Sequence, residues 1–91
     1  MEIESRRVQP ADNDVKLKRT LAGVFDLPPD AIADDDSMDT IAAWDSLAHL
    51  RLILALEEAF QISLGEQEAF EILSVPLIKT VLEEHGIEFG V

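Results

Sequence analysis

The stretch Trp44–Phe60, WDSLAHLRLILALEEAF, is the strongest helical segment of this 91-residue chain and decides its fold. Good helix formers recur along it at helical spacing, and it contains neither Gly nor Pro. Asp45 or Ser46 can cap its N-terminus, because either side chain can accept a hydrogen bond from a free backbone N–H group. We therefore predict a helix over residues 46–60.

This helix carries more apolar surface than a small core can cover. Its core stripe comprises Leu52, Ile53, Leu56 and Phe60. An adjoining leucine stripe comprises Leu47, Leu50 and Leu54. Together the stripes span about 220°, whereas a surface helix needs an apolar arc nearer to about 100°. We interpret the leucine stripe as a docking surface, because Arg51 and Glu58 flank it on one side and Glu57 on the other. The alternative is that the rest of the chain covers both stripes and makes the leucines core residues.

Helical periodicity predicts three further helices: from residue 12, 13 or 14 to 25, from 66 to 73, and from 74 to the glycine at 86. Pro28 and Pro29 stop the first of them, and Ser74 can cap the last. With Gly86 in a left-handed conformation, Ile87 would contact Leu82 as in a Schellman motif. No alternating strand pattern occurs. The predicted fold class is all-α, a small four-helix bundle of three main helices and one short helix.

A long acidic segment, residues 26–44, connects the first two helices. It has too many carboxylates for a strand and too little periodicity for a long helix. Four apolar residues can pin it to the core: Ile32, Met38, Ile41 and Trp44. We therefore expect an ordered loop with one short turn. Residues 1–11 show no periodicity and are expected to form a flexible tail, which leaves 12–91 as a single domain.

The charge of the chain restricts its partners. The net charge is −12, and 15 of the 19 acidic residues follow Phe25. Such a domain repels nucleic acid and anionic lipid, and is attracted to basic faces of other proteins. No apolar run reaches the roughly 20 residues of a membrane-spanning helix, and the N-terminus lacks the apolar core of a signal peptide. We expect no membrane insertion and a cytoplasmic location. Since there is no Cys, a thiolate nucleophile and a Cys-based metal site are excluded.

The sequence around Ser46 resembles the Asp-Ser-Leu motif of acyl carrier proteins. The motif lies within residues 44–50, WDSLAHL, and the similarity extends over the first helix, the acidic loop and the later helices, from about Asp14 to Ile87. This resemblance implies an acyl-carrier-like bundle in which Ser46 holds a 4′-phosphopantetheine arm. A phosphopantetheinyl transferase would attach the arm from coenzyme A, and its thiol would carry acyl groups as thioesters between enzymes of fatty acid, polyketide or specialised lipid synthesis.

The resemblance also implies roles for the neighbours of Ser46. Asp45 would help to present the serine to the transferase, and Leu47 would join Ser46 and Asp45 at the cofactor-binding site. The face read by acyl-loading and acyl-transferring enzymes would comprise the leucine stripe with Glu57 and Glu58. Those enzymes would carry basic docking faces, and the carrier, expected to be a monomer, would catalyse nothing itself. An acyl chain would shelter between helices near Ile53, Leu56 and Ile72.

Two departures from the family pattern bear on partner choice. Arg51 places a positive charge on a helix that is mostly acidic in members serving fatty acid synthesis, and Ala48-His49 replaces a more polar pair. We interpret both as signs of specialised partners, with Arg51 part of the partner-binding face. Peptidyl carriers more often have Gly or His just before the serine, whereas this chain has Ala43-Trp44-Asp45. We therefore favour an acyl cargo over the alternative of a peptidyl or aminoacyl carrier.

Three other interpretations compete with the carrier. In an acidic helical adaptor, Ser46 would be only a cap, and the leucine stripe would bind a partner helix or groove. In a serine hydrolase, His49 would reach back one turn to Ser46, although no oxyanion site or deep pocket is evident. A calcium loop over residues 34–45 fails, because Met38 stands where a ligand is needed and Asp39 where Gly is needed.

Overall fold

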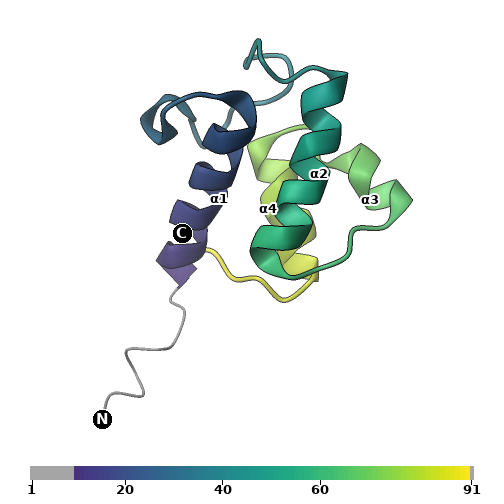
Figure 1. Cartoon of the computed structure of the whole chain (residues 1–91). Helices are drawn as coiled ribbons and strands as arrows, with labels where there is room; N and C mark the ends of the chain where they lie inside the picture. Colours follow the sequence, from purple (N-terminus) through teal and green to yellow (C-terminus); the bar gives the residue numbers. More distant parts are fainter. Residues whose placement is uncertain (1–9, 91) are drawn as a thin grey trace.

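The computed structural model describes residues 10–90, and every regular element within them is a helix (Figure 1). In chain order these are α1 (Pro10–Phe25), a short 3-10 helix η2 (Pro29–Ala31), α2 (Ser46–Phe60), α3 (Glu66–Glu71) and α4 (Val75–Glu84). The predicted all-α bundle of three main helices and one short helix is therefore confirmed.

The core lies between α1, α2 and α4. Leu17 and Leu21 of α1, Leu52 and Leu56 of α2, and Ile78 of α4 are completely buried. Burying one such side chain contributes roughly 1.5–3 kcal/mol, so these contacts determine how α2 is rotated about its axis. That rotation decides which residues α2 presents to solvent.

Capping residues define the ends of α4. The Ser74 hydroxyl accepts a hydrogen bond from the backbone N–H of Leu77 at 3.2 Å. Gly86 has a φ of 90°, and the N–H of Ile87 donates to the carbonyl oxygen of Leu82 at 3.0 Å. This is the pattern of a Schellman motif, and the predicted cap at each end of the helix is confirmed.

The start of α1 differs from the prediction, whereas its end at Phe25 is as predicted. The helix begins at Pro10, ahead of the predicted start between residues 12 and 14. Proline is tolerated in a first helical turn, because backbone N–H groups there have no intrahelical partner. Two residues of the predicted tail are thus helical, and residues 1–9 lie outside the described part of the chain. At the other end, Asp26 adopts the left-handed conformation with a φ of 57°, and the N–H of Leu27 donates to the oxygen of Ala22 at 3.0 Å. The helix has therefore ended before the two prolines.

The end of α3 also differs. The helix stops at Glu71, two residues before the predicted end. The carbonyl oxygen of Leu73 accepts the backbone N–H of Met38 at 3.0 Å, beside an isolated antiparallel bridge between Ser37 and Ser74. The backbone after Glu71 pairs with the acidic loop instead of continuing the helix.

The acidic loop over residues 26–44 is ordered, as predicted. Ile32, Ile41 and Trp44 are buried in the core, and Met38 packs against it. Near its middle, the Asp36 carboxylate accepts hydrogen bonds from the Ala33 N–H at 2.7 Å and the Thr40 hydroxyl at 2.8 Å. These two hydrogen bonds lower the pKa of Asp36, the Ala33 bond more than the Thr40 bond. At least one loop carboxylate thus shapes a turn and is not merely solvated.

The C-terminal segment up to Gly90 returns to α1 (Figure 1). The Gly90 N–H donates to the Asp14 carboxylate at 2.7 Å, and the Asn13 amide donates to the Glu88 carbonyl oxygen at 2.8 Å. Phe89 packs edge-on against the ring of Phe60 at the end of α2. Within residues 10–90, none of the helices combines the length and the apolarity needed to cross a bilayer.

Candidate functional site

Ser46 is the first residue of α2, and its side chain is exposed. The prediction left open whether Asp45 or Ser46 caps this helix. The structure answers the question, because the Asp45 carboxylate accepts the N–H of Ala48 at 2.8 Å and the Asp45 carbonyl accepts that of His49, also at 2.8 Å. The Ser46 hydroxyl has no hydrogen-bond partner among the described residues. It is therefore free for chemistry that an N-cap hydroxyl could not perform without releasing the helix.

The position of this hydroxyl favours a negatively charged substituent. Ser46 stands at the N-terminus of a 15-residue helix, where the first backbone N–H groups have no intrahelical acceptor. The helix dipole stabilises a nearby anion by roughly 0.3–1 kcal/mol at an exposed site. A phosphodiester on the Ser46 oxygen would therefore lie at the favourable end of α2.

The leucine stripe faces solvent. Leu47, Leu50 and Leu54 are 59%, 61% and 66% exposed, whereas Leu52 and Leu56 on the other side of the helix are 0% exposed. The orientation predicted for the two stripes is confirmed. The alternative, in which the rest of the chain covers the leucine stripe, is wrong for this isolated chain.

Phe70 adds an exposed aromatic ring that the sequence analysis missed. Its side chain on α3 is 71% exposed, and α3 buries none of its own residues. No sequence signal indicated this exposure, because the predicted helix ran to residue 73, whereas the observed helix of six residues can turn few side chains inward. Together with the leucine stripe, Phe70 leaves large apolar side chains open on two successive helices.

The charged residues beside the leucine stripe lie in different environments. Arg51 and Glu58 are exposed and line a groove between α1 and α2. Glu57, on the opposite flank, is half-buried and accepts the backbone N–H of Leu64 at 2.8 Å. The Glu57 carboxylate therefore holds the connection between α2 and α3, a contact that the sequence did not predict.

His49 is engaged away from Ser46. The buried indole of Trp44 donates from Nε1 to Nδ1 of His49 at 3.0 Å, and the two rings are stacked. The other ring nitrogen, Nε2, lies 2.8 Å from the carbonyl oxygen of Ala69 on α3. Both nitrogens are thus occupied, so this arrangement does not provide the Ser46–His49 pair that a hydrolase would require.

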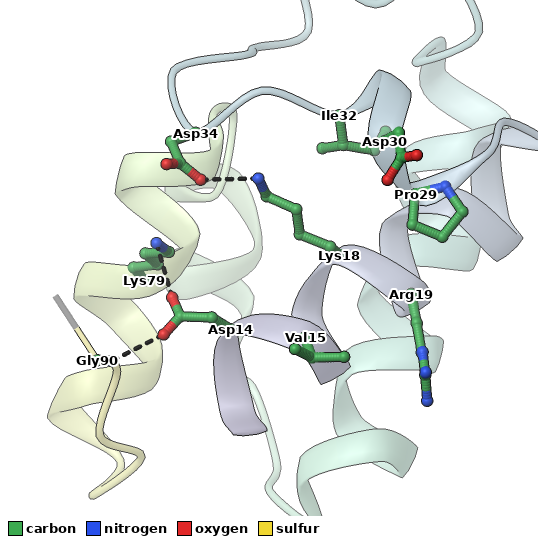
Figure 2. A pocket seen from close by; sticks show the side chains of 10 residues that line it. All are labelled: Asp14, Val15, Lys18, Arg19, Pro29, Asp30, Ile32, Asp34, Lys79 and Gly90. Atoms are coloured by element: carbon green, nitrogen blue, oxygen red, sulfur yellow. Dashed lines mark hydrogen bonds and ion pairs between the residues drawn. The ribbon is translucent and has the colours of Figure 1, made fainter. Parts of the chain in front are cut away.

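A hollow of about 680 Å³ lies elsewhere, between α1, η2, α4 and the C-terminal segment (Figure 2). Two ion pairs cross it, Lys18 to Asp34 at 2.9 Å and Lys79 to Asp14 at 3.0 Å. The hydrogen bond and the charge of Lys18 lower the pKa of Asp34. Both lysines are paired with carboxylates, and the hollow shares no residue with the start of α2.

The residues expected to shelter an acyl chain are close-packed. Leu56 and Ile72 are fully buried in the core, and the partly buried Ile53 packs against that core. None of these three lines a hollow described in residues 10–90. An acyl chain would have to separate side chains that are in contact in this structure.

Comparison with known families agrees with this arrangement. A family model described as a phosphopantetheine attachment site matches residues 15–82, which is well over half of the chain. The match runs from the first turns of α1 to the last turn of α4 and includes the whole acidic loop. The chain therefore belongs to the phosphopantetheine attachment-site family, whose members carry covalently attached 4′-phosphopantetheine.

Proposed function

We propose that this chain is an acyl carrier protein and that Ser46 is the residue to which 4′-phosphopantetheine is attached. The observation that carries the proposal is that Asp45, and not Ser46, caps the start of α2. Asp45 caps the helix with its carboxylate, and the exposed Ser46 hydroxyl has no partner among the described residues. A transferase can therefore esterify this hydroxyl without removing a capping bond.

Coenzyme A would supply the arm. A phosphopantetheinyl transferase would join the phosphate of its phosphopantetheine half to the Ser46 oxygen, breaking the pyrophosphate bond of coenzyme A and releasing adenosine 3′,5′-bisphosphate and the hydroxyl proton. When bound, the arm supplies a thiol that carries acyl groups as thioesters. The chain has no Cys, so it adds no competing thiol. The N-terminus of α2 would favour the negative charge of the new phosphodiester. The protein itself would present the Ser46 hydroxyl and provide a docking surface that partner enzymes recognise.

We propose the leucine stripe as the centre of that docking surface. Three exposed leucines in one row give a partner apolar surface to bury, and the charged rim at Glu58 and Arg51 orients it. With a net charge of −12, the chain would be drawn to enzymes with basic docking faces. Arg51 would reject a uniformly basic face and favour a partner with a carboxylate at that point. An acyl cargo is preferred over a peptidyl one because Ala43-Trp44-Asp45 precedes the serine.

The proposal is tested by intact-mass spectrometry of the full chain after incubation with coenzyme A and a permissive phosphopantetheinyl transferase. One added phosphopantetheine is expected on the wild type and none on Ser46→Ala. An adaptor that uses Ser46 only as part of a helix end would stay unmodified in both proteins. Absence of modification under conditions that load a known carrier would refute the carrier function.

A further inference from the structure

The two partners of His49 dictate its protonation state. An indole N–H can only donate a hydrogen bond, and a backbone carbonyl can only accept one. Both bonds, from Trp44 to Nδ1 and from Nε2 to Ala69, form only when the imidazole is neutral with its proton on Nε2. A second proton on Nδ1 would oppose the indole N–H, and the bond to Trp44 would be lost.

These bonds connect the residues on both sides of Ser46. Trp44 lies two residues before the serine and is held in the core by Phe25, with ring centroids 5.0 Å apart. His49 lies three residues after the serine, and its backbone N–H donates to Asp45 at 2.8 Å. The side chains of Trp44 and His49 therefore close a loop of hydrogen bonds around the segment that presents the hydroxyl.

The same imidazole connects this segment to α3. The short helix contributes no buried side chain of its own, so polar contacts carry much of its attachment. Its two histidine contacts are His49 at Ala69 and His85 at Glu68, at 2.8 Å and 2.9 Å. Of these two histidines, only His49 also forms a hydrogen bond with Trp44, the residue before Asp45-Ser46.

We propose that His49 is a positioning residue for the modification of Ser46. In its neutral Nε2–H form it locks Trp44 to α3, and the segment from Trp44 to His49 is held in the conformation that the transferase binds. The inference rests on the proposed attachment at Ser46. Without the lock the competent conformation is one of several, and the apparent affinity falls in proportion to its population. The transfer step is unchanged once the correct conformation is bound, so the effect belongs in KM and not in kcat.

The matched variant is His49→Gln. Its side-chain amide can both accept and donate a hydrogen bond, so it can replace the imidazole toward Trp44 and Ala69 while every other residue stays unchanged.

The kinetic test measures loading of the full-length apo chain by a permissive transferase with coenzyme A. His49→Ala is expected to raise KM for the carrier about fivefold to tenfold, with kcat within about twofold, as suits the loss of one or two hydrogen bonds. His49→Gln should restore most of the affinity. His85→Ala is the matched control on the other side of α3 and should keep KM within about twofold.

A spectroscopic measurement keeps the inference testable if His49→Ala does not fold. Nitrogen-15 NMR of the wild type near neutral pH should find the His49 proton on Nε2 and an indole N–H of Trp44 in a hydrogen bond. A proton on Nδ1, or an unchanged KM in a folded His49→Ala, would overturn the inference. A wild-type chain that is never loaded would instead count against the proposed function.

Discussion

Replacing Leu54 with Ala is expected to leave the stability of the domain nearly unchanged, whereas replacing Leu52 with Ala should cost much of it. The two leucines lie two residues apart on α2 and are 66% and 0% exposed. Truncating a buried leucine to Ala costs about 2–5 kcal/mol, because the apolar contacts are lost and a cavity remains. Only about a third of Leu54 is covered, which limits its loss to below about 1 kcal/mol. Since small domains have only about 5–15 kcal/mol of stability, the difference is large enough to measure.

Urea unfolding of the two variants measures the free energies of unfolding, and transferase loading measures the docking function. Leu54→Ala should remain as stable as the wild type within about 1 kcal/mol, yet lose at least about fivefold in kcat/KM, as expected for a residue near the centre of an interface. If Leu54→Ala is as unstable as Leu52→Ala, then Leu54 lies in the core and the face of α2 that carries it is not exposed. If it folds and is loaded at the wild-type rate, the leucine stripe is not the surface that the transferase binds.

Four further predictions concern the scaffold. Gly23→Ala should stabilise the chain by roughly 0.5–1 kcal/mol, because an added Cβ meets nothing within 4 Å in the interior of α1. Gly86→Ala should destabilise it by about 1 kcal/mol or more, because residue 86 has a φ of 90°; urea unfolding that finds the same sign for both would contradict this contrast. Ser74→Ala should cost about 1 kcal/mol by removing the N-cap of α4, and no change in the same experiment would refute that role. The backbone N–H of Gly65, more than any other group, holds the pKa of Glu68 below its ordinary value of 4.5. The charged Glu68 therefore stabilises the fold above that pH, and this stabilisation is lost as the pH falls through the lowered pKa. The difference in stability between wild type and Glu68→Gln should therefore shrink below about pH 4.5, and a difference that stays constant down to pH 2 would disprove it.

Local signals predicted the parts of the fold that local interactions determine. The bounds of α2 follow from a capping aspartate and an uninterrupted run of helix formers, and the end of α4 from a glycine that adopts a left-handed conformation. The start of α1 was missed because Pro10 looks like a helix breaker, although it costs no hydrogen bond in a first turn. The end of α3 depends on Leu73 pairing with the distant loop, for which the sequence of α3 carries no signal.

The features of the site likewise fall into those that local sequence patterns predicted and those that they did not. The excess apolar arc of α2 predicted that the leucine stripe would be exposed, since a small core cannot cover both stripes. The division between Asp45 as cap and Ser46 as free hydroxyl could not be predicted, because both residue types cap helices equally well. The hydrogen bond from the Leu64 N–H to Glu57 and the bond between His49 and α3 were also missed, because they depend on where the chain returns after α2.

The central claim is that the Ser46 hydroxyl carries the prosthetic group, and peptide mapping of the chain loaded from coenzyme A tests it most directly. Tandem mass spectrometry should locate phosphopantetheine on the peptide containing Ser46 and on no other serine. The exposed Ser63 provides a matched control, since Ser63→Ala should be loaded like the wild type and Ser46→Ala not at all. Phosphopantetheine on a different residue, or a Ser46→Ala chain that is still loaded, would contradict the account.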